Sequence, residues 1–264
     1  MHKRIITKTV FILLLMVSTC WAGGCGKNLA ASQPEKETCP VEMILKQLDE
    51  EALKLKSYQC RIEYLFSQPV LESETLRKGS LYYARAGEKS KLRINFQTLK
   101  QDDEKEQKYI EQYIFDGVWL TQIDYKFKQV KLYQQAEPNE PVDAFELASR
   151  NFPIIGFTKA EELRNQFEIT LVEQQGTEAE NFVRLHLKVK PDSTYKDDYT
   201  SIDFWIGKKL DLPSKIVAVS TEEDIYEIKL LKAKVNKKLN KKVFEVKIPK
   251  GFTVEKTPLN VKEK

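Results

Sequence analysis

Side chains that carry acid–base or nucleophilic chemistry are scarce in this sequence of 264 residues. Histidine occurs twice, at His2 and His186, and a single histidine in the folded chain cannot complete a histidine-rich metal site or an ordinary Ser-His-Asp triad. His186 lies in residues 183–189 (VRLHLKV), where apolar and polar residues alternate as along a half-buried strand. The alternation places His186 on the polar side, so we predict that it faces solvent and has no catalytic role.

Carboxylates are the remaining groups that could hold a ligand, since hard cations such as Ca²⁺ bind carboxylate oxygens. They cluster in residues 102–104, 192–198 and 222–224, all of which we expect to connect strands. None has the glycine-bearing pattern of a calcium loop, and the sequence contains neither a phosphate-binding glycine loop nor a G-x-S-x-G motif. We therefore predict solvated turns, no metal, no cofactor and a protein that is not an enzyme.

Four cysteines are too few to form a disulfide scaffold in a chain of this length. Cys39 begins a predicted helix and Cys60 follows its end, so about 16 helical residues separate them by roughly 24 Å. A disulfide requires Cα atoms within about 7 Å, which excludes a bridge between these two residues. Cys60 lies on the apolar side of its strand, and we predict a buried, unreactive thiol there.

Residues 1–24 have the features of an export signal. Lys3, Arg4 and Lys8 precede the apolar run of residues 10–17, which is too short to span a bilayer. Removing residues 1–24 takes away these basic residues and no acid, which lowers the formal net charge from +4 to +1. The basic excess that would suggest nucleic acid thus belongs to the signal, and we predict no nucleic-acid partner.

Two cysteines near the end of the signal could mark its cleavage site. Residues 22–25 (AGGC) resemble a bacterial lipobox, in which the cysteine becomes the acylated first residue, although Ala22 stands where a larger aliphatic residue is common. Residues 17–20 (VSTC) are a second candidate, and ordinary cleavage after Ala22 would release a free periplasmic protein. Acylation of Cys25 leaves an even number of thiols and cleavage after Ala22 an odd number. We favour a protein of the bacterial periplasm that is membrane-anchored as a lipoprotein through Cys25.

The mature chain is long enough for one large domain, and the apolar share of the sequence, 41%, supports a core. We divide it into a flexible tether at 25–38, a single domain at 39–258 and a polar tail at 259–264. Pro40 stands at a first helical position, and the apolar residues after it recur at helical spacing. They are Val41, Ile44, Leu45, Leu48, Ala52 and Leu55.

From Tyr58 onward the apolar period changes to two, and turn residues separate one strand-like run from the next. After the first strand at 58–66, the further runs are residues 79–85, 91–99, 108–115, 118–124, 128–134, 167–175, 181–190, 200–206, 214–221, 225–235 and 243–248. Successive strands without helices between them predict one antiparallel sheet or barrel.

Residues 135–166 interrupt this series of strands. Two short helices are predicted at 142–150 and 159–166, with the apolar segment 151–157 (NFPIIGF) between them. A helical insertion of about 30 residues is long for a connection between strands. It either packs over the sheet as a structural cover or moves as a lid.

Several short motifs resemble those of the periplasmic lipoprotein carrier family that contains LolA and LolB. Residues 114–120 (IFDGVWL) resemble the family's apolar hairpin around a DG pair, and residues 124–130 (DYKFKQV) continue with its D…KQV turn. Residues 79–81 together with Arg85 resemble the family's G-x-L…R-P strand, with Ala86 in place of the proline.

The resemblance spans about residues 44–256, because residues 92–96 follow as expected and residues 235–254 resemble the closing strands. It implies an α+β fold in which an unclosed, strongly curved antiparallel sheet, or half-barrel, carries an N-terminal helix and a helical lid. Members of the family bind lipoprotein acyl chains or other lipids in an apolar cavity and carry them across the periplasm.

The resemblance also implies a set of binding residues. Residues 142–166 would form the lid, and Arg85 would hold the lid shut by hydrogen bonds to its carbonyls. The candidate ligand-binding residues, each of which could instead be plain core, are Tyr64, Phe66, Leu81, Tyr83, Ile94, Phe96, Phe115, Trp119, Phe145, Leu147, Phe152, Ile154 and Ile155. Trp119 has the further alternative of only stabilising its hairpin.

The function expected from these features is non-catalytic binding and carriage of acyl chains by a monomer in the bacterial envelope. Its partners would be lipids or lipoprotein acyl chains and the lipoprotein-sorting machinery of the inner or outer membrane. The alternatives are an envelope sensor or regulator and a structural lipoprotein, each of which would use the same fold without lipid transport. A cavity filled by the protein's own side chains would favour the structural alternative.

Overall fold

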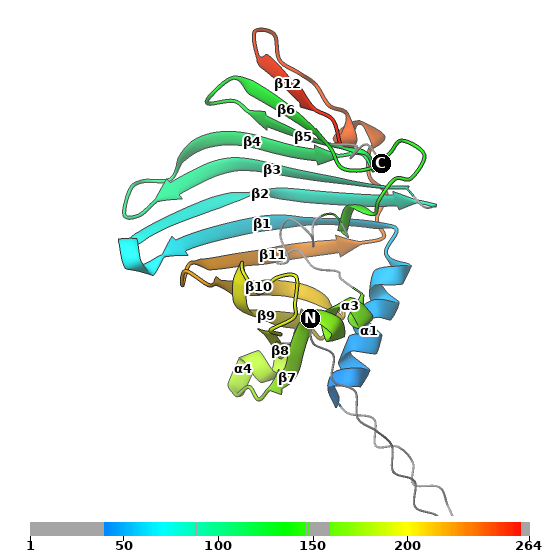
Figure 1. Ribbon diagram of the computed structural model, residues 1–264, viewed down its shortest axis with the longest axis vertical. Coiled ribbons are helices and arrows are strands. Elements are labelled where there is room, and N and C mark those ends of the chain that lie inside the picture. The colour runs from blue at the N-terminus through cyan, green and yellow to red at the C-terminus, as the bar shows by residue number, and fades with distance from the viewer. Residues whose placement is uncertain (1–39, 88, 146, 148–158, 260–264) are drawn as a thin grey trace, which may run out of the picture. The chain divides into compact units, whose positions relative to one another are not determined.

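The computed structural model describes residues 40–87, 89–145, 147 and 159–259, all of which belong to one compact unit. Figure 1 shows its helices and strands. The expected signal, the tether and the apolar segment 151–157 lie outside the described residues.

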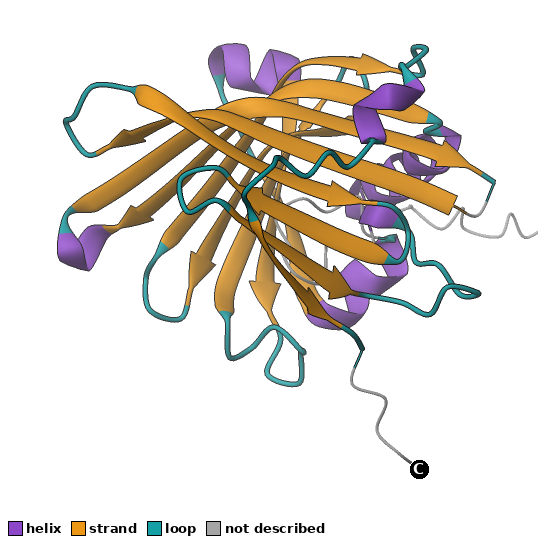
Figure 2. Cartoon of the chain, turned by 90° about the horizontal axis from the view of Figure 1, so that it is seen from above, coloured by secondary structure: helices purple, strands orange, loops and turns teal. Residues whose placement is uncertain are grey.

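The centre of the structure is one sheet of twelve strands, in the order β12-β6-β5-β4-β3-β2-β1-β11-β10-β9-β8-β7. The strands are β1 (Ser57–Gln68), β2 (Ser73–Ala86), β3 (Lys89–Gln101), β4 (Gln107–Phe115), β5 (Trp119–Asp124), β6 (Gln129–Gln134), β7 (Phe167–Val172), β8 (Phe182–Val189), β9 (Tyr199–Gly207), β10 (Leu212–Ser220), β11 (Ile225–Val235) and β12 (Thr253–Thr257). Among the described residues β12 and β7 do not pair with each other, so the sheet is open. All neighbouring strands are antiparallel except β12 and β6, which are parallel. The predicted open, mostly antiparallel sheet is confirmed, and Figure 2 shows how strongly it twists.

Two helices, α1 (Pro40–Lys54) and α3 (Ala160–Gln166), lie near the end of the sheet where β1 begins (Figure 1). The apolar stripe of α1 packs into the core, with Leu45 and Leu48 almost inaccessible to solvent and Val41, Ile44 and Ala52 partly buried. The two helices are joined by polar contacts as well. Asp49 Oδ1 accepts a hydrogen bond from Ala160 N at 2.8 Å, and Arg164 donates to both carboxylate oxygens of Glu42.

The main hydrophobic core lies on one face of the sheet, which we call the core face. Alternation along the strands places Ile62, Leu81, Ile94 and Phe115 on this face, where each is at most 8% exposed. The buried residues of α1, α3 and β7 pack against them as part of the same cluster. Burying each such side chain contributes about 1.5–3 kcal/mol, so this cluster accounts for most of the hydrophobic stabilisation of the fold.

A second, smaller cluster lies on the opposite face of the sheet, which we call the outer face. It consists of Ile114, Ile123 and Val130, which come from adjacent strands. Phe252, just before β12, packs against it. The chain after β11 therefore covers part of the outer face.

The structure corrects one predicted strand. Residues 243–248 do not form a strand; instead a 3₁₀ helix, η3 (Lys241–Phe244), is followed by irregular chain. The Asn240 side chain accepts a hydrogen bond from Lys242 N and caps this turn. Arg93 on β3 donates hydrogen bonds to the carbonyls of Val243 and Glu245, at 2.8 and 3.1 Å. These carbonyls therefore bond to a guanidinium group rather than to a neighbouring strand.

Several element boundaries also differ from the predictions. β2 begins at Ser73, six residues before the predicted start, so that it pairs with the whole of β1. β7 ends at Val172 and is followed by a helix, α4 (Gly176–Asn181), where the sequence predicted only a turn. A short 3₁₀ helix, η1 (Pro69–Leu71), connects β1 to β2.

Candidate functional site

Most of the sequence-predicted binding residues that the structure describes lie on or against the core face. Tyr64 and Phe66 are half-buried there, on the part of β1 that is farther from α1. The buried ones, each at most 8% exposed, are Leu81, Tyr83, Ile94, Phe96, Phe115, Phe145 and Leu147. Phe152, Ile154 and Ile155 lie outside the described residues, as does Cys25.

Trp119 differs from the other candidates, because it lies on the outer face. Phe115 on the core face pairs with Leu120, and side chains alternate along a strand, so the neighbouring Trp119 points the other way. The ammonium group of Lys256 lies 4.4 Å from the centre of its ring. Trp119 thus contacts the C-terminal strand β12 and does not lie with the other candidates on the core face.

Residues 143–145 are attached to the core face at the ends of β2 and β3, and we call them the latch segment. The rings of Tyr83 and Phe145 stack with centroids 4.0 Å apart. Asp143 Oδ2 accepts hydrogen bonds from the hydroxyl of Tyr83 and from Arg85 Nη2, each at 3.1 Å. The backbone N–H of Ala144 donates to the hydroxyl oxygen of Ser90 at 2.6 Å.

Arg85 therefore contacts the segment in which the sequence placed a lid, but through a different group from the one expected. The resemblance implied hydrogen bonds to lid carbonyls, whereas the partner found is the carboxylate of Asp143. Burial acts to raise the pKa of Asp143, but the hydrogen bond from Ser90 and the charge of Arg85 outweigh it, and the net pKa lies below its ordinary value. Asp143 is thus ionised at neutral pH, as an ion pair with Arg85 requires.

Away from α1, the core face carries a group of rings that we call the aromatic stretch, of which Phe96 is buried in the main core and the others are partly buried. It consists of Tyr64, Phe66, Phe96, Tyr113, Tyr199 and Tyr226. Phe66 stacks on Tyr226 with ring centroids 4.9 Å apart, and the other neighbouring rings lie 6.0 to 6.4 Å apart. Burial raises the pKa of Tyr64 and Tyr199 to about 12, so their hydroxyls are neutral at physiological pH.

The binding residues predicted from the sequence include only part of the aromatic stretch. Tyr113 was not among the predicted binding residues, although its period-two spacing from Phe115 places it on the same face. Tyr199 and Tyr226 also lie there, and Tyr226 on β11 pairs with Phe66 on β1. That pairing joins strands more than 150 residues apart in sequence, so no local pattern could have indicated it.

A buried carboxylate lies beside the aromatic stretch. Glu111 is 3% exposed, and its oxygens accept hydrogen bonds from Tyr113 at 2.8 Å, Gln122 at 2.9 Å and Tyr109 at 3.2 Å. Arg77 Nη1 lies 3.5 Å from Glu111 Oε2. These donors offset the cost of burying the charge, and they attach β2, β4 and β5 to one another at the core face.

The outer face carries His186, the only histidine among the described residues. Its Nδ1 lies 3.2 Å from Asp203 Oδ1, which also accepts a hydrogen bond from Arg184 at 3.0 Å. His186 is thus on the predicted polar side of β8, but in contact with a carboxylate. Arg184 and Lys215 lie over the ring of Trp205, at 4.6 and 4.5 Å from its centre. No nucleophile lies next to His186 among these groups.

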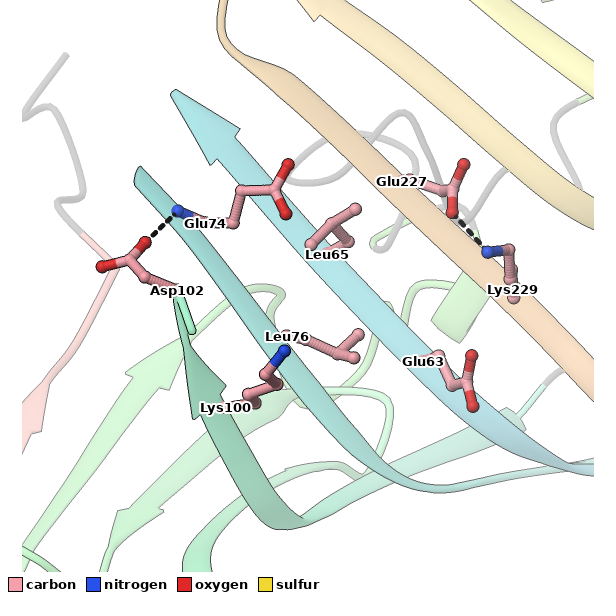
Figure 3. Close-up of a pocket in the computed structure, with 8 residues that line it drawn as sticks. All are labelled: Glu63, Leu65, Glu74, Leu76, Lys100, Asp102, Glu227 and Lys229. Atoms are coloured by element: carbon pink, nitrogen blue, oxygen red, sulfur yellow. Dashed lines mark hydrogen bonds and ion pairs between the residues drawn. The ribbon is translucent and has the colours of Figure 1, made fainter. Parts of the chain in front are cut away.

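A groove of about 200 Å³ also lies on the outer face, across β11, β1, β2 and the end of β3 (Figure 3). Its lining is Glu63, Leu65, Glu74, Leu76, Lys100, Asp102, Glu227 and Lys229. Several of these groups bond within the groove: Lys229 contacts Glu227 at 2.7 Å, and Asp102 accepts from Glu74 N at 2.6 Å. Residues 102–104, the first of the acidic clusters, therefore form part of a turn and its cap.

Nothing in the described part of the chain assembles a metal site: no three His, Cys, Asp or Glu side chains come together there. Cys60 is a free, buried thiol, and burial raises its pKa to about 12. None of the described helices has the length and apolar character needed to cross a membrane.

Comparison with known proteins gives matches among solved structures alone. No family model and no curated protein matches the sequence. An uncharacterized conserved protein from Thermus thermophilus is 12% identical, with a TM-score of 0.49, over 82% of this chain and 98% of that one. A chain of the Pseudomonas aeruginosa MucA/MucB complex is 10% identical, with a TM-score of 0.44, over 78% of this chain and 60% of that one.

A LolA superfamily protein from Nitrosomonas europaea is 13% identical, with a TM-score of 0.33, over 79% of this chain and 99% of that one. The superfamily that the sequence motifs resemble is thus among the structural neighbours. At these identities and TM-scores the matches say nothing of a shared activity, so the function rests on the residues of this chain.

Proposed function

We propose that this protein is a non-catalytic binder and carrier of lipid acyl chains, including those of lipoproteins, in the bacterial cell envelope. The observation that carries the proposal is the aromatic stretch, which extends the apolar core face beyond the residues packed under α1 and α3. The half-buried rings of this face offer apolar contact area to acyl chains. Each acyl methylene that is buried there contributes about 0.8 kcal/mol to the binding free energy.

The latch segment supports the proposal. Asp143 and Phe145 attach it to Tyr83 and Arg85 through a few polar contacts and one ring stack. Contacts of this kind can be broken and remade at modest cost, because partly exposed ion pairs contribute little. Residues 142–166 would act as the lid that covers bound acyl chains and releases them.

The test is native mass spectrometry of the gently purified protein, followed by extraction and identification of any bound lipid. We expect bound lipid in the wild type and faster loss of lipid from Arg85→Leu, because the latch segment is then held less firmly. Arg61→Leu, at an exposed position on the outer face, is the matched control. Wild-type protein without bound lipid, which also fails to take up lipid from vesicles, would contradict the proposal.

A structural lipoprotein is the second candidate, favoured by the tight burial of Leu81, Tyr83 and Phe115. Those three side chains form part of the core beside the helices, so they offer no surface to a ligand. Under the carrier proposal, only the aromatic stretch would contact the acyl chains. Co-purified lipid would exclude this candidate.

The cellular location belongs to the same proposal. Export by residues 1–24, acylation of Cys25 and action in the periplasm with lipoprotein-sorting machinery fit a carrier whose cargo begins and ends in membranes. Radiolabelled fatty acid should be incorporated into the wild-type protein and not into Cys25→Ser. If Cys25→Ser still incorporates the radiolabelled fatty acid, the acyl group is attached at another residue and Cys25 is not the lipoprotein anchor.

A further inference from the structure

A groove lined by lysines lies where β4 extends past the end of β5. It has a volume of about 410 Å³, and we call it the lysine groove. Its lining is Leu99, Gln107, Lys108, Tyr109, Ile110, Tyr125 and Lys126. The volume falls within the range of about 300–1,000 Å³ that is typical of small-molecule sites. Two cations line it and no carboxylate does.

The lysine groove lies at the edge of β4 and has lining residues on both faces of the sheet, because alternation places Gln107 and Tyr109 on the core face and Lys108 and Ile110 on the outer face. In the sheet register Tyr64 pairs with Arg77, Arg77 with Leu99, and Leu99 with Gln107, and residues directly opposite one another share a face. The hydroxyl of Tyr109 donates to Glu111, and the guanidinium of Arg77 lies 5.6 Å from the centre of the Tyr109 ring. One wall of the groove therefore extends the aromatic stretch.

The carboxylates near the groove are already bonded to other groups. Asp124 Oδ1 accepts from the backbone N–H groups of Lys126 and Phe127. Glu106 pairs with Lys78 at 2.9 Å, and Glu111 is bonded to two tyrosines, a glutamine and an arginine, as described above.

The ammonium groups of the groove remain without a carboxylate partner. Lys108 and Lys126 are exposed, and neither has an ion pair with any other described residue. The aromatic and aliphatic side chains between them are apolar surfaces. This combination of charge and apolar surface suits a ligand with an anionic end and an apolar end.

We propose that the lysine groove binds the phosphate of an anionic diacyl lipid whose acyl chains lie along the aromatic stretch. The inference rests on the proposed lipid-binding function and names the class of lipid. Lys108 and Lys126 would form charge-assisted hydrogen bonds to the phosphate oxygens at the edge of β4. Lys108, which pairs with Thr98 on the outer face, would reach the phosphate from that side, while Leu99 and Tyr109 would contact the glycerol and the first methylenes from the core-face side. The bound lipid would then have one orientation, with its headgroup away from α1.

The experiment measures which lipids the protein removes from a bilayer. The purified protein is incubated with vesicles of equimolar dioleoyl phosphatidylglycerol and dioleoyl phosphatidylcholine, which share the same chains, and is separated from the vesicles by flotation. The lipids bound to it are extracted and counted by mass spectrometry. We expect phosphatidylglycerol to exceed phosphatidylcholine by at least about fivefold, since one lysine beside an anionic lipid surface gives a preference of this size.

A double variant and its control assign the preference to the groove. Lys108→Gln with Lys126→Gln should reduce bound phosphatidylglycerol at least about fivefold and leave bound phosphatidylcholine unchanged. Lys238→Gln with Lys241→Gln removes two exposed lysines in the chain between β11 and β12, the second of them on η3, and should leave both lipids unchanged. Far-ultraviolet circular dichroism verifies that every variant is folded.

The outcomes separate this inference from the proposed function. Equal binding of the two lipids, or a preference that the groove variant keeps, would overturn the headgroup site while leaving lipid carriage intact. A preference lost equally in the control variant would also overturn it, because general surface charge would then explain the result. Absence of both lipids would contradict the proposed function and the headgroup site together. Inorganic phosphate that displaces the bound lipid at low concentration would show that the groove is a site for free phosphate.

Discussion

Individual side chains join the strands of this sheet to each other and to the segment that we propose as its lid. Asp143 accepts hydrogen bonds from Tyr83 and Arg85, and Glu111 accepts them from three neighbours. Neither acid was a candidate in the sequence. Both lie among apolar or ordinary strand residues, and their partners come from other strands, so that their roles depend on sheet register.

The Arg85–Asp143 pair predicts a pH dependence of stability. The pKa of Asp143 lies below its ordinary value in the folded protein, so its contribution is fully present above the unfolded pKa of about 3.9 and is lost as the pH falls through the folded pKa. Between pH 7 and pH 3 the wild type should therefore lose more free energy of unfolding than Asp143→Asn does. Urea denaturation at several pH values measures this change in the free energy of unfolding.

Glu140→Gln, at an exposed position, is the control for this prediction. An equal loss of unfolding free energy in the wild type and in Asp143→Asn would show that Asp143 does not cause the pH dependence.

The buried carboxylate predicts the effect of removing one hydroxyl. Tyr113→Phe deletes the 2.8 Å hydrogen bond to Glu111 and should reduce the free energy of unfolding by about 1–3 kcal/mol, since a buried charge loses a donor. Tyr226→Phe serves as the control, because it removes a hydroxyl from the same aromatic stretch without a hydrogen bond to Glu111. Similar stabilities for the two variants would argue against the Glu111 network.

The thiol of Cys60 should be unreactive in the folded protein. Its pKa of about 12 and its burial leave little thiolate at pH 8. Iodoacetamide should alkylate the Cys60 peptide only after denaturation in urea, as seen by peptide mass mapping. Rapid alkylation without urea would mean that β1 opens readily or that the thiol is accessible.

At the scale of the elements, local sequence pattern predicted most of the strands and two helices, α1 and α3, well. The period-two runs and the pair Asp116-Gly117 mark hairpins whose residues are neighbours in sequence. The failures lie where a distant side chain decides the conformation. Arg93 bonds to the carbonyls of the 243–248 segment, and β12 pairs in parallel with β6, more than 100 residues earlier.

One glycine is required by the close approach of two strands. A Cβ added to Gly79 on β2 would lie 1.9 Å from the carbonyl oxygen of Asn95 on β3, next to a register shift between these strands. Gly79→Ala should therefore destabilise the protein by about 3 kcal/mol.

Gly207→Ala is the matched control for this substitution. A Cβ at Gly207 would meet its nearest atoms at 3.8 and 3.9 Å, an ordinary contact, so the free energy of unfolding should change by less than about 1 kcal/mol. Thermal denaturation of both variants measures the difference. Equal melting temperatures would show that β2 and β3 separate at Gly79 without cost.

At the scale of the whole molecule, the change from a helical period to a period of two predicted one antiparallel sheet or barrel after an N-terminal helix, and the family resemblance implied that the sheet is open. The binding surface was less predictable. Aliphatic and aromatic residues on one face of a strand look alike whether they fill a core or line a cavity. Which of them stay partly exposed depends on where α1, α3 and the latch segment end. The sequence therefore indicated that most candidates share one face of the sheet but did not indicate the aromatic stretch as a unit.

The central claim is that acyl chains bind to the core face along the aromatic stretch. The most direct measurement is photo-crosslinking with a fatty acid that carries a diazirine in its chain, followed by peptide mapping of the labelled protein. Labelling should fall on the peptides that contain Tyr64, Phe66, Tyr113 and Tyr226 and should be absent from those that contain His186 and Trp205 on the outer face. Labelling confined to the outer-face peptides, or no labelling above that of a denatured control, would contradict the claim.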